Sequence, residues 1–379
     1  IIAGAFVRMT GSGMGCPDWP KCFGFYVPPT QVSQILFKAN NDYSKGQMIL
    51  YNKEKLLVAK SDFKSDDFIN LNNWEVYEKH DYVIFNPVHT WIEYINRLIG
   101  AISGIPILIF TIISIIYFKK FRHLTLISII TLVAMGFQAW LGKTVVDSNL
   151  EGFKITIHML MALFIVCLLI YLVFSGVKKS NIKENVQFRF LLIIAIFLSL
   201  IQIILGTQVR QFVDEQAQLF YYDKSKWFNE IPVIYEYHRT FSIAVVSINF
   251  FLFYLNNKLS LGNKYVNHLM ILLLIEVISG VMMFYFDFPF GTQTIHLVFA
   301  SLIFGVQFYI LLNNFLIKNT KINSNFKILD IGCGRGKILG SLKSRLKLKY
   351  KPLGIDCLLY TSDAADERSS VDLGGRRII

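Results

Sequence analysis

Thr156-Ile157-His158 recurs further along the chain as Thr294-Ile295-His296, and both copies lie in long apolar stretches. His158 and His296 each come sixteen residues after a glycine, Gly142 in the first copy and Gly280 in the second. A histidine inside lipid is costly unless it faces a cavity, a partner or a metal. The repeat therefore predicts two copies of one four-helix unit in a membrane, each built around a buried ligand site.

The repeat extends to two other pairs of segments. Gly4-x-x-Val7-Arg8 returns as Gly206-x-x-Val209-Arg210, and Asn96-Arg97 on an apolar stretch returns as His238-Arg239. Facing histidines on bundle helices commonly hold heme iron from both sides. The alternative for each position is a polar side chain that only hydrogen-bonds a neighbouring helix. Four candidate ligand positions follow, all near the outer ends of apolar stretches: Asn96, His158, His238 and His296.

The composition is that of a membrane protein. Of the 379 residues, 54% are apolar and 33 are Phe, which is more apolar surface than a soluble protein of this length covers. Eight apolar stretches lie at residues 1–9, 89–118, 124–142, 154–175, 190–208, 233–255, 265–286 and 293–316. We predict an all-α polytopic membrane protein of eight transmembrane helices, arranged as two pseudo-symmetric four-helix bundles, residues 1–176 and 188–317.

The short loops predict the orientation. Lys and Arg gather in alternate loops, around Lys119 to Arg122, Lys178 to Arg189 and Lys258 to Lys264, and such loops stay in the cytoplasm. Both termini are then cytoplasmic, and the long loop 10–86 and the loop 210–232 face the outside. The chain starts without Met inside an apolar stretch, so we expect the first helix to be truncated.

Most of the formal charge of +12 comes from the C-terminal tail. Residues 318–355 hold ten Lys or Arg against a single acid, Asp330. The membrane part is nearly neutral, so the charge does not indicate a nucleic-acid partner. His80, His123 and His268 fall in loops or at helix ends, and we expect them to be solvated.

Glu93 lies on the same helical face as Asn96, Arg97 and Gly100. A carboxylate several residues into lipid is a functional candidate. The alternative is a structural ion pair between Glu93 and Arg97. In the second repeat the matching position is Tyr235, so we expect no acid at the second site. This difference predicts one reacting heme, and one heme for storage or electron transfer.

Arginines accompany the candidate ligands. Guanidinium groups match the geometry of carboxylates, so we expect some of these arginines to pair with heme propionates. For Arg8, extension of the side chain to the membrane surface is an equally weighted alternative. The candidates are Arg8, Arg97, Arg210 and Arg239.

Cys16 and Cys22 lie six residues apart in a Pro- and Gly-rich loop on the outer side. That spacing and compartment favour a disulfide over a metal site, since no further ligands are close in sequence. Of the other cysteines, Cys167 is expected to be buried in a helix, and Cys333 and Cys357 lie in the tail.

Several of these stretches resemble the heme A synthase family. The stretch GAFVRMTGSGMGCPDWPKCFG (4–24) is similar to the family's first helix end and outer loop, and HTWIEYINRLIG (89–100) to its second helix. QAWLGKTVV (138–146), QIILGTQVR (202–210), YEYHR (235–239) and the two TIH motifs resemble later signatures. The resemblance covers about residues 1–317 and implies eight helices in two pseudo-symmetric bundles.

The resemblance implies an oxidoreductase of the bacterial plasma membrane. It would convert a methyl group of heme O to the formyl group of heme A by successive hydroxylations with oxygen from water. It also implies heme b on His238 and His296, and heme O in the first half near His158. Glu93 is the candidate catalytic residue there because of its place on the membrane helix. Where the family commonly has a histidine, this chain has Asn96, so His158 is the strong ligand there unless His89 compensates.

The implied partners are heme O synthase (protoheme farnesyltransferase) and cytochrome oxidase assembly. The sequence leaves open the electron acceptor and the oligomeric state, including a homo-oligomer. A different class of protein, a diheme electron carrier of the cytochrome b type, is the alternative. Glu93 and the cysteine loop separate the two, because a pure carrier needs neither.

The tail differs in character from about residue 321. Lys327 to Gly336 resemble the first glycine-rich loop of S-adenosylmethionine-dependent methyltransferases, with Gly354-Ile355-Asp356 as a following acidic strand end. We expect residues 318–356 to be part of a methyltransferase-like domain that was joined to the membrane domain by error. Residues 357–379 resemble a translated sequencing adapter and are expected to be absent from the natural protein.

Overall fold

The computed structural model describes residues 1–18, 20–52, 55–78, 85–176, 185–220, 223, 226–227 and 231–316, and four short strands beyond them. The chain forms two compact units, Ile1–Asn314 and Phe315–Ile379. His80, Cys333, Cys357 and the basic loop 177–184 lie outside the described residues, so the predictions made for them remain predictions.

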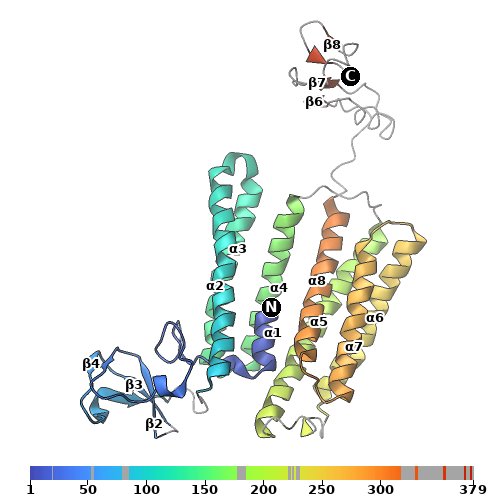
Figure 1. The fold of residues 1–379 in the computed structure, drawn as a ribbon. Coiled ribbons are helices and arrows are strands. Elements are labelled where there is room, and N and C mark those ends of the chain that lie inside the picture. Colours follow the sequence, from blue (N-terminus) through green and yellow to red (C-terminus); the bar gives the residue numbers. More distant parts are fainter. Residues whose placement is uncertain are drawn as a thin grey trace. The chain divides into compact units, whose positions relative to one another are not determined.

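The first unit is mainly helical (Figure 1). Seven helices of the described part, α2 to α8, are long and apolar enough to cross a membrane, which confirms a polytopic membrane protein. The first helix has eight residues, so an eighth span stays a prediction. The helices are α1 (Ile2–Met9), α2 (Pro87–Ile116), α3 (Phe118–Asp147), α4 (Gly152–Ser175), α5 (Val186–Leu219), α6 (Val233–Lys258), α7 (Tyr265–Tyr285) and α8 (Thr292–Leu316).

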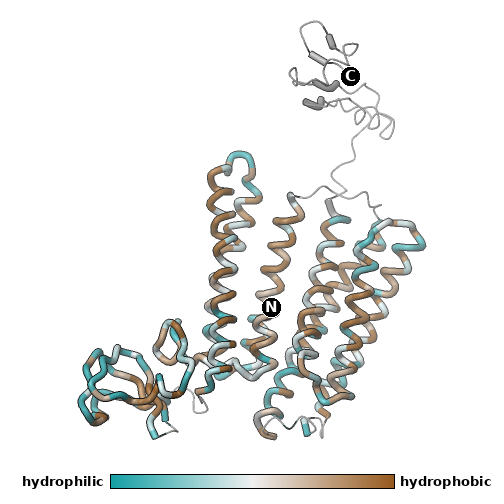
Figure 2. Tube along the Cα trace, viewed as in Figure 1, coloured by the Kyte–Doolittle hydropathy of each residue, from teal (hydrophilic) through white to brown (hydrophobic). Residues whose placement is uncertain are grey.

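The long helices are hydrophobic along most of their length (Figure 2), and many of their large apolar side chains are exposed in the isolated chain. Ile105 and Ile112 on α2 and Ile271 on α7 are more than half exposed in the isolated chain. Water around such a surface would be unfavourable, whereas lipid covers it without cost. The start of α2 is capped as its sequence predicts, because Asn86 Oδ1 accepts the Val88 N–H at 3.0 Å and Pro87 is the first helical residue.

Helices α5 to α8 share one apolar core. Phe188 and Leu192 from α5, Leu252 from α6, Leu269 from α7 and Ile310 from α8 are almost fully buried against one another. A second cluster joins the two halves of the unit. It is made by Met159 and Leu163 of α4, Ile203 of α5 and Phe304 of α8. Side chains along α4, α5 and α8 therefore connect the early helices to the late ones.

The outer loop between α1 and α2 contains strands that the sequence-based prediction of an all-α fold did not include. Three antiparallel strands pair in the order β2 (Met48–Tyr51), β3 (Lys55–Ala59) and β5 (Trp74–Val76). A second pair is formed by β1 (Asp42–Tyr43) and β4 (Phe63–Lys64). Tyr43 and Trp74 are buried together with rings 5.0 Å apart, so aromatic packing gives this loop its own small core.

Helix α5 extends past its apolar stretch, which corrects the prediction of a loop beginning at residue 210. Polar residues lower the mean hydropathy there, but the helix continues to Leu219. Every fourth residue is apolar, so these side chains lie on one side of the helix. Val213 and Ala217 lie on that side and pack against Trp227 and Phe288. The helix thus ends more than two turns later than hydropathy predicts.

In the second unit the described residues are four short strands. The strands β6 (Leu329–Ile331) and β7 (Leu353–Ile355) pair in parallel, and β8 (Val371–Asp372) pairs antiparallel with β9 (Arg376–Arg377). β6 therefore lies within the stretch Lys327 to Gly336, and β7 ends at Ile355 of Gly354-Ile355-Asp356. The glycine-rich loop itself lies outside the described residues, and so does most of 357–379, so the origin of this tail stays a prediction.

Candidate functional site

Each of the four candidate ligand positions lies against a glycine of the preceding helix. A Cβ atom built on Gly206 would be 3.2 Å from His238 Cε1, and one on Gly280 would be 3.3 Å from His296 Cε1. In the first half, the corresponding distance from Gly142 to His158 Cε1 is 3.4 Å. The spacing between glycine and histidine in the sequence thus has a steric cause, since a larger residue would push the ring away from the helix.

Asn96 follows the same pattern more loosely. A Cβ atom on Gly4 of α1 would be 3.9 Å from Asn96 Oδ1. Asn96 therefore occupies the place that a histidine takes in the other three pairs, as the repeated Gly-x-x-Val-Arg motif predicts. His89 lies about two turns earlier on α2 and is part-buried. None of these contacts tests whether His89 serves as a ligand in place of Asn96, so this stays a prediction.

A glutamine four residues before the glycine contacts the same histidine. Gln138 Nε2 lies 3.3 Å from His158 Nε2 and donates to the backbone carbonyl of His158 at 3.2 Å. Gln202 Nε2 lies 3.2 Å from His238 Nδ1 and donates to the His238 carbonyl at 3.0 Å. Helices α3 and α5 therefore each hold the histidine of the next helix through one glutamine and one glycine.

Helix α7 carries Glu276 where the other two helices carry glutamine, which corrects the prediction that the second half has no acid at its site. Glu276 Oε1 lies 3.3 Å from His296 Nδ1, and the Glu276 side chain is 15% exposed. Sequence reasoning missed this residue. The signal was present in the spacing, because Gln138, Gln202 and Glu276 each stand four residues before the glycine of their helix.

His238 and His296 face each other from α6 and α8, with ring centroids 6.3 Å apart. An imidazole nitrogen lies about 1.1 Å from its ring centroid and binds a first-row metal at about 2 Å, so two rings on opposite sides of one metal have centroids about 6 Å apart. The pair fits a metal held from both sides. The described residues contain no cluster of three or more His, Cys, Asp or Glu, so this is a two-histidine arrangement.

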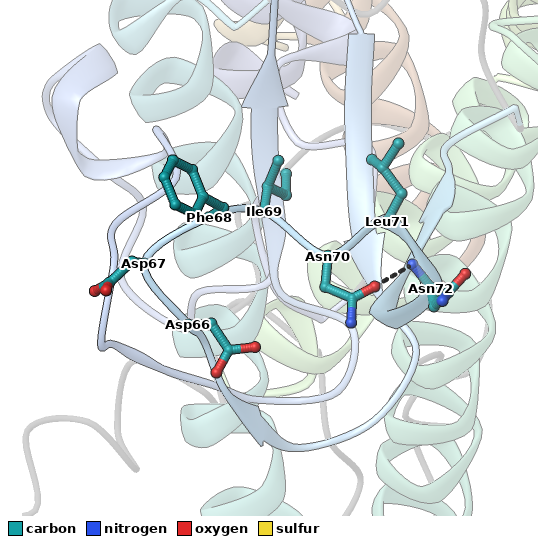
Figure 3. A pocket seen from close by; sticks show the side chains of 7 residues that line it. All are labelled: Asp66, Asp67, Phe68, Ile69, Asn70, Leu71 and Asn72. Carbon is teal, nitrogen blue, oxygen red and sulfur yellow. Dashed lines mark hydrogen bonds between the residues drawn. The ribbon is translucent and has the colours of Figure 1, made fainter.

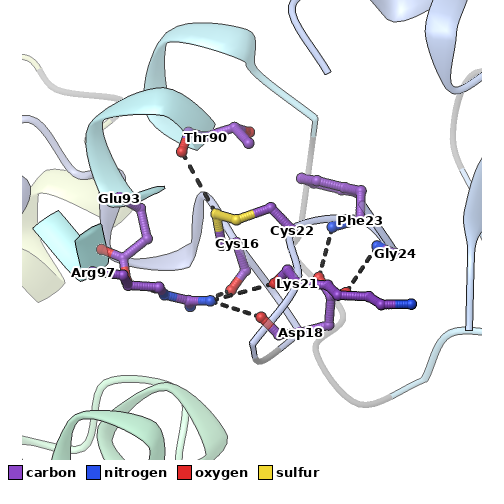
Figure 4. The surroundings of a disulfide bond; sticks show 9 residues. All are labelled: Cys16, Asp18, Lys21, Cys22, Phe23, Gly24, Thr90, Glu93 and Arg97. Carbon is purple, nitrogen blue, oxygen red and sulfur yellow. Dashed lines mark hydrogen bonds and ion pairs between the residues drawn. A yellow bond between two sulfur atoms is a disulfide. The ribbon is translucent and has the colours of Figure 1, made fainter. Parts of the chain in front are cut away.

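In the first half, Glu93 is buried and paired with Arg97 one turn further along α2. Arg97 Nε donates to Glu93 Oε1 at 2.9 Å, and the Glu93 side chain is 7% exposed. The structural ion pair weighed from the sequence is therefore present. Figure 4 shows the Arg97 guanidinium between Glu93 and the disulfide loop. Its Nη atoms donate to the carbonyls of Asp18 and Cys16, both at 2.7 Å.

The predicted disulfide between Cys16 and Cys22 is present (Figure 4). The loop that it closes lies directly on the start of α2, where Cys16 Sγ is 3.5 Å from the Thr90 carbonyl oxygen. Gly15 is required at this approach, because a Cβ atom there would be 2.3 Å from the His89 carbonyl oxygen. The loop therefore covers the end of α2 that carries Glu93.

Asp18 orders the same loop from within. Its Oδ1 accepts the Phe23 N–H at 2.6 Å and its Oδ2 accepts the Gly24 N–H at 2.8 Å. Burial raises the pKa of the Asp18 carboxyl above its ordinary value, and the two N–H groups and Arg97 offset part of that rise. The carboxylate thus satisfies two backbone donors at a cost in desolvation.

The remaining arginines take other partners. Arg8 Nη2 and Arg210 Nη2 lie 2.5 Å and 2.6 Å from the two carboxylate oxygens of Asp214. Arg210 also donates to Gln293 Oε1 at 2.5 Å. Arg239 is exposed, with its guanidinium 5.9 Å from the centroid of the Tyr235 ring. The pairing of Arg8, Arg97, Arg210 and Arg239 with heme propionates remains a prediction.

Among the other histidines, His123 and His268 are exposed, as their places near helix ends predict. Cys167 is part-buried in α4 and is not in a disulfide. A surface hollow in the outer loop is lined by residues 66 to 72 (Figure 3), with Asn70 Oδ1 accepting the Asn72 N–H at 3.1 Å. It contains no candidate ligand or catalytic residue, so we place the functional site at the helices.

The fold and the site define a polytopic membrane protein that holds histidines in matched positions of alternate helices, α4, α6 and α8. The chain belongs to the cytochrome oxidase assembly protein family, whose model matches residues 1–64 and 78–308. A heme A synthase of Flavobacterium johnsoniae is 24% identical over 344 residues, covering 82% of this chain and 92% of the relative. Those of Ehrlichia canis (25% over 343 residues, 82% and 88%) and Rickettsia conorii (26% over 360 residues, 84% and 94%) are similar.

Proposed function

We propose that this protein is a heme A synthase, an oxidoreductase that converts the methyl group of heme O to the formyl group of heme A. The observation that carries the proposal is the pair of facing histidines in a chain whose relatives are named heme A synthases. The repeated glycine contacts support two pseudo-symmetric four-helix bundles, residues 1–176 and 188–317, each with one heme.

The second half is the proposed site of heme b. His238 and His296 would hold its iron from opposite sides, with the ring separation given above. With both histidines bound to its iron, this heme would supply electron transfer. Gly206 and Gly280 leave room for the Cε1 edges of the two rings to approach α5 and α7 closely.

The first half is the proposed site of heme O, with His158 as the strong ligand. Each hydroxylation would add one oxygen atom from water to the methyl carbon and release two electrons and two protons. Glu93 would accept a proton from the attacking water or stabilise positive charge at the carbon. Arg97 holds the Glu93 carboxylate, and its other N–H groups bind the disulfide loop. The position of Glu93 and the position of this loop therefore depend on each other.

The alternative class, a diheme electron carrier of the cytochrome b type, explains the histidines but gives Glu93 no function. The disulfide loop on α2 is likewise unnecessary for electron transfer alone. A buried carboxylate near one candidate ligand and the names of the relatives therefore favour the synthase.

We further propose a setting and partners for the enzyme. It would lie in the bacterial plasma membrane with both termini in the cytoplasm and the loop 10–86 outside, where the disulfide is stable. Heme O synthase would supply the substrate and cytochrome oxidase would receive the product. A membrane electron acceptor would take the electrons.

The test is expression of residues 1–317 in membranes that make heme O, followed by extraction and chromatography of the hemes. We expect heme A and its hydroxylated intermediate in the wild type. His238→Ala and His296→Ala should each abolish the low-spin b-type spectrum, because each removes one axial ligand. Protein that carries two hemes and forms no oxidised product would favour the electron carrier, and an unchanged spectrum in both variants would overturn the heme b assignment.

A further inference from the structure

We propose that Glu276 is the positioning residue of His296: its carboxylate fixes the ring tautomer and lowers the reduction potential of the heme that His296 holds. This inference rests on the proposed heme b site and adds a determinant of its potential. It concerns the second half of the protein, in which the sequence repeat alone predicts no acid.

Three oxygen atoms surround His296 Nδ1. Ser279 Oγ lies at 3.0 Å, the Glu276 carbonyl oxygen at 3.2 Å and Glu276 Oε1 at 3.3 Å. The Ser279 hydroxyl donates its own hydrogen to the Glu276 carbonyl, so its oxygen is free to accept. With three acceptors around it, Nδ1 carries the hydrogen. The lone pair then lies on Nε2, which is the nitrogen available to iron.

The Glu276 carboxylate lies in a membrane helix and reaches no cation among the described residues. Its Oε2 is buried and has no hydrogen-bond partner in the described part of the chain. A buried acid within a membrane helix is costly and is seldom kept for packing alone. Its described side-chain partner is the imidazole of a candidate axial ligand, so the acid is explained by that ligand.

The other histidines in matched positions have a neutral partner. Gln138 at His158 and Gln202 at His238 place an amide Nε2, a donor, beside the ring. Only the His296 position, of the three, has a carboxylate acceptor. The two axial ligands of one heme would therefore differ, with His296 the more electron-donating of the two.

A carboxylate that accepts a hydrogen bond from the far nitrogen of a ligand histidine makes the ring more basic. A more basic ligand stabilises the oxidised iron relative to the reduced iron. We therefore expect Glu276 to lower the reduction potential, which favours passage of electrons from this heme to an acceptor. Gly280 supports the same placement, since the lack of a side chain there lets the His296 ring approach α7 closely.

The experiment is a spectroelectrochemical titration of the low-spin heme in purified protein. Glu276→Gln keeps the shape and an acceptor but removes the negative charge. We expect the ratio of reduced to oxidised heme at a fixed applied potential to rise about tenfold, a shift of about 59 mV for a one-electron couple. Glu276→Asp, which keeps the charge, should remain closer to the wild type than Glu276→Gln does.

The matched control is Gln138→Leu, which removes the partner of a histidine in the other half and should leave this potential unchanged. A potential in Glu276→Gln equal to that of the wild type, with the heme bound, would overturn the inference and leave the proposed function intact. A wild type without any low-spin heme would instead refute the heme b site itself. Loss of heme from folded Glu276→Gln and its retention in Glu276→Asp would support the inference, because the charge would then be needed to hold the ligand.

Discussion

Gly280 lies against the ring of His296, so closely that a Cβ atom on the glycine would be 3.3 Å from His296 Cε1. The same relationship joins Gly206 to His238 at 3.2 Å. Contacts this short leave no room for a side chain unless the ring moves. The position of each ring therefore depends on having glycine, and no larger residue, at this place in the preceding helix.

Gly206→Val and Gly280→Val should displace these rings and weaken heme binding. We expect the heme b content of the purified protein to fall about tenfold or more, the loss typical when a ligand's supporting shell is altered. Heme content per protein, measured from the reduced spectrum, tests this. Gly136→Val is the control, since a Cβ atom on Gly136 meets nothing within 4 Å. Full heme content in both site variants would show that the ring positions tolerate a larger neighbour.

Glu93→Gln should separate the chemistry from the packing at the first site. Glutamine keeps the shape and an oxygen that can accept from Arg97, but it cannot take a proton from water. We expect heme binding as in the wild type, with heme O or its hydroxylated intermediate accumulating. Chromatography of extracted hemes gives the measurement. Wild-type yields of heme A would reduce Glu93 to a structural partner of Arg97.

Arg97→Leu should loosen the disulfide loop. The arginine bridges Glu93 on α2 to the carbonyls of Asp18 and Cys16, and its loss leaves a buried carboxylate unpaired. Removing one partner of a buried pair costs on the order of 3 kcal/mol. We expect faster hydrogen exchange in residues 16–24 than in the wild type. Substitution of an exposed arginine should leave the exchange of this loop unchanged. Arg239→Leu serves as the comparison, and equal exchange in the two variants would contradict this role.

Asp18 should make the stability of the loop depend on pH. Its pKa is raised by burial, so between the unfolded and folded values the folded loop binds more protons than the unfolded one. The free energy of unfolding of the loop therefore decreases as the pH rises through that interval, and it is constant above it. Limited proteolysis of the loop over a pH series measures this. In Asp18→Asn the dependence should vanish, and a dependence retained in that variant would assign it to another group.

Much of the helical architecture follows from the sequence, because long apolar stretches in lipid can form little else. The capped start of α2 at Asn86 and Pro87 was equally predictable, since both residues act locally. The strands around Tyr43 and Trp74 were not, because a small aromatic core in a loop depends on contacts between distant residues. The end of α5 was missed for a related reason, as hydropathy does not detect an amphipathic extension.

At the site, the histidines and Glu93 could be found from their cost in lipid and from the repeat. Glu276 could not be found by matching the repeat at Asn96 and His238, because it stands on the helix before the ligand. The contacts of Arg97 with the loop also lie beyond sequence reasoning. They join residues 79 and 81 positions apart through backbone carbonyls, which every residue possesses.

Asp214 binds two arginines that occupy the same place in the repeat, Arg8 of the first half and Arg210 of the second. The position that matches Asp214 in the first half is Ser12. If the two halves were identical, these two arginines would meet with either two acids or none between them. In this chain a single acid, Asp214, pairs with both arginines. The contact is therefore asymmetric, because the acid that joins Arg8 of the first half to Arg210 of the second has no counterpart in the first half.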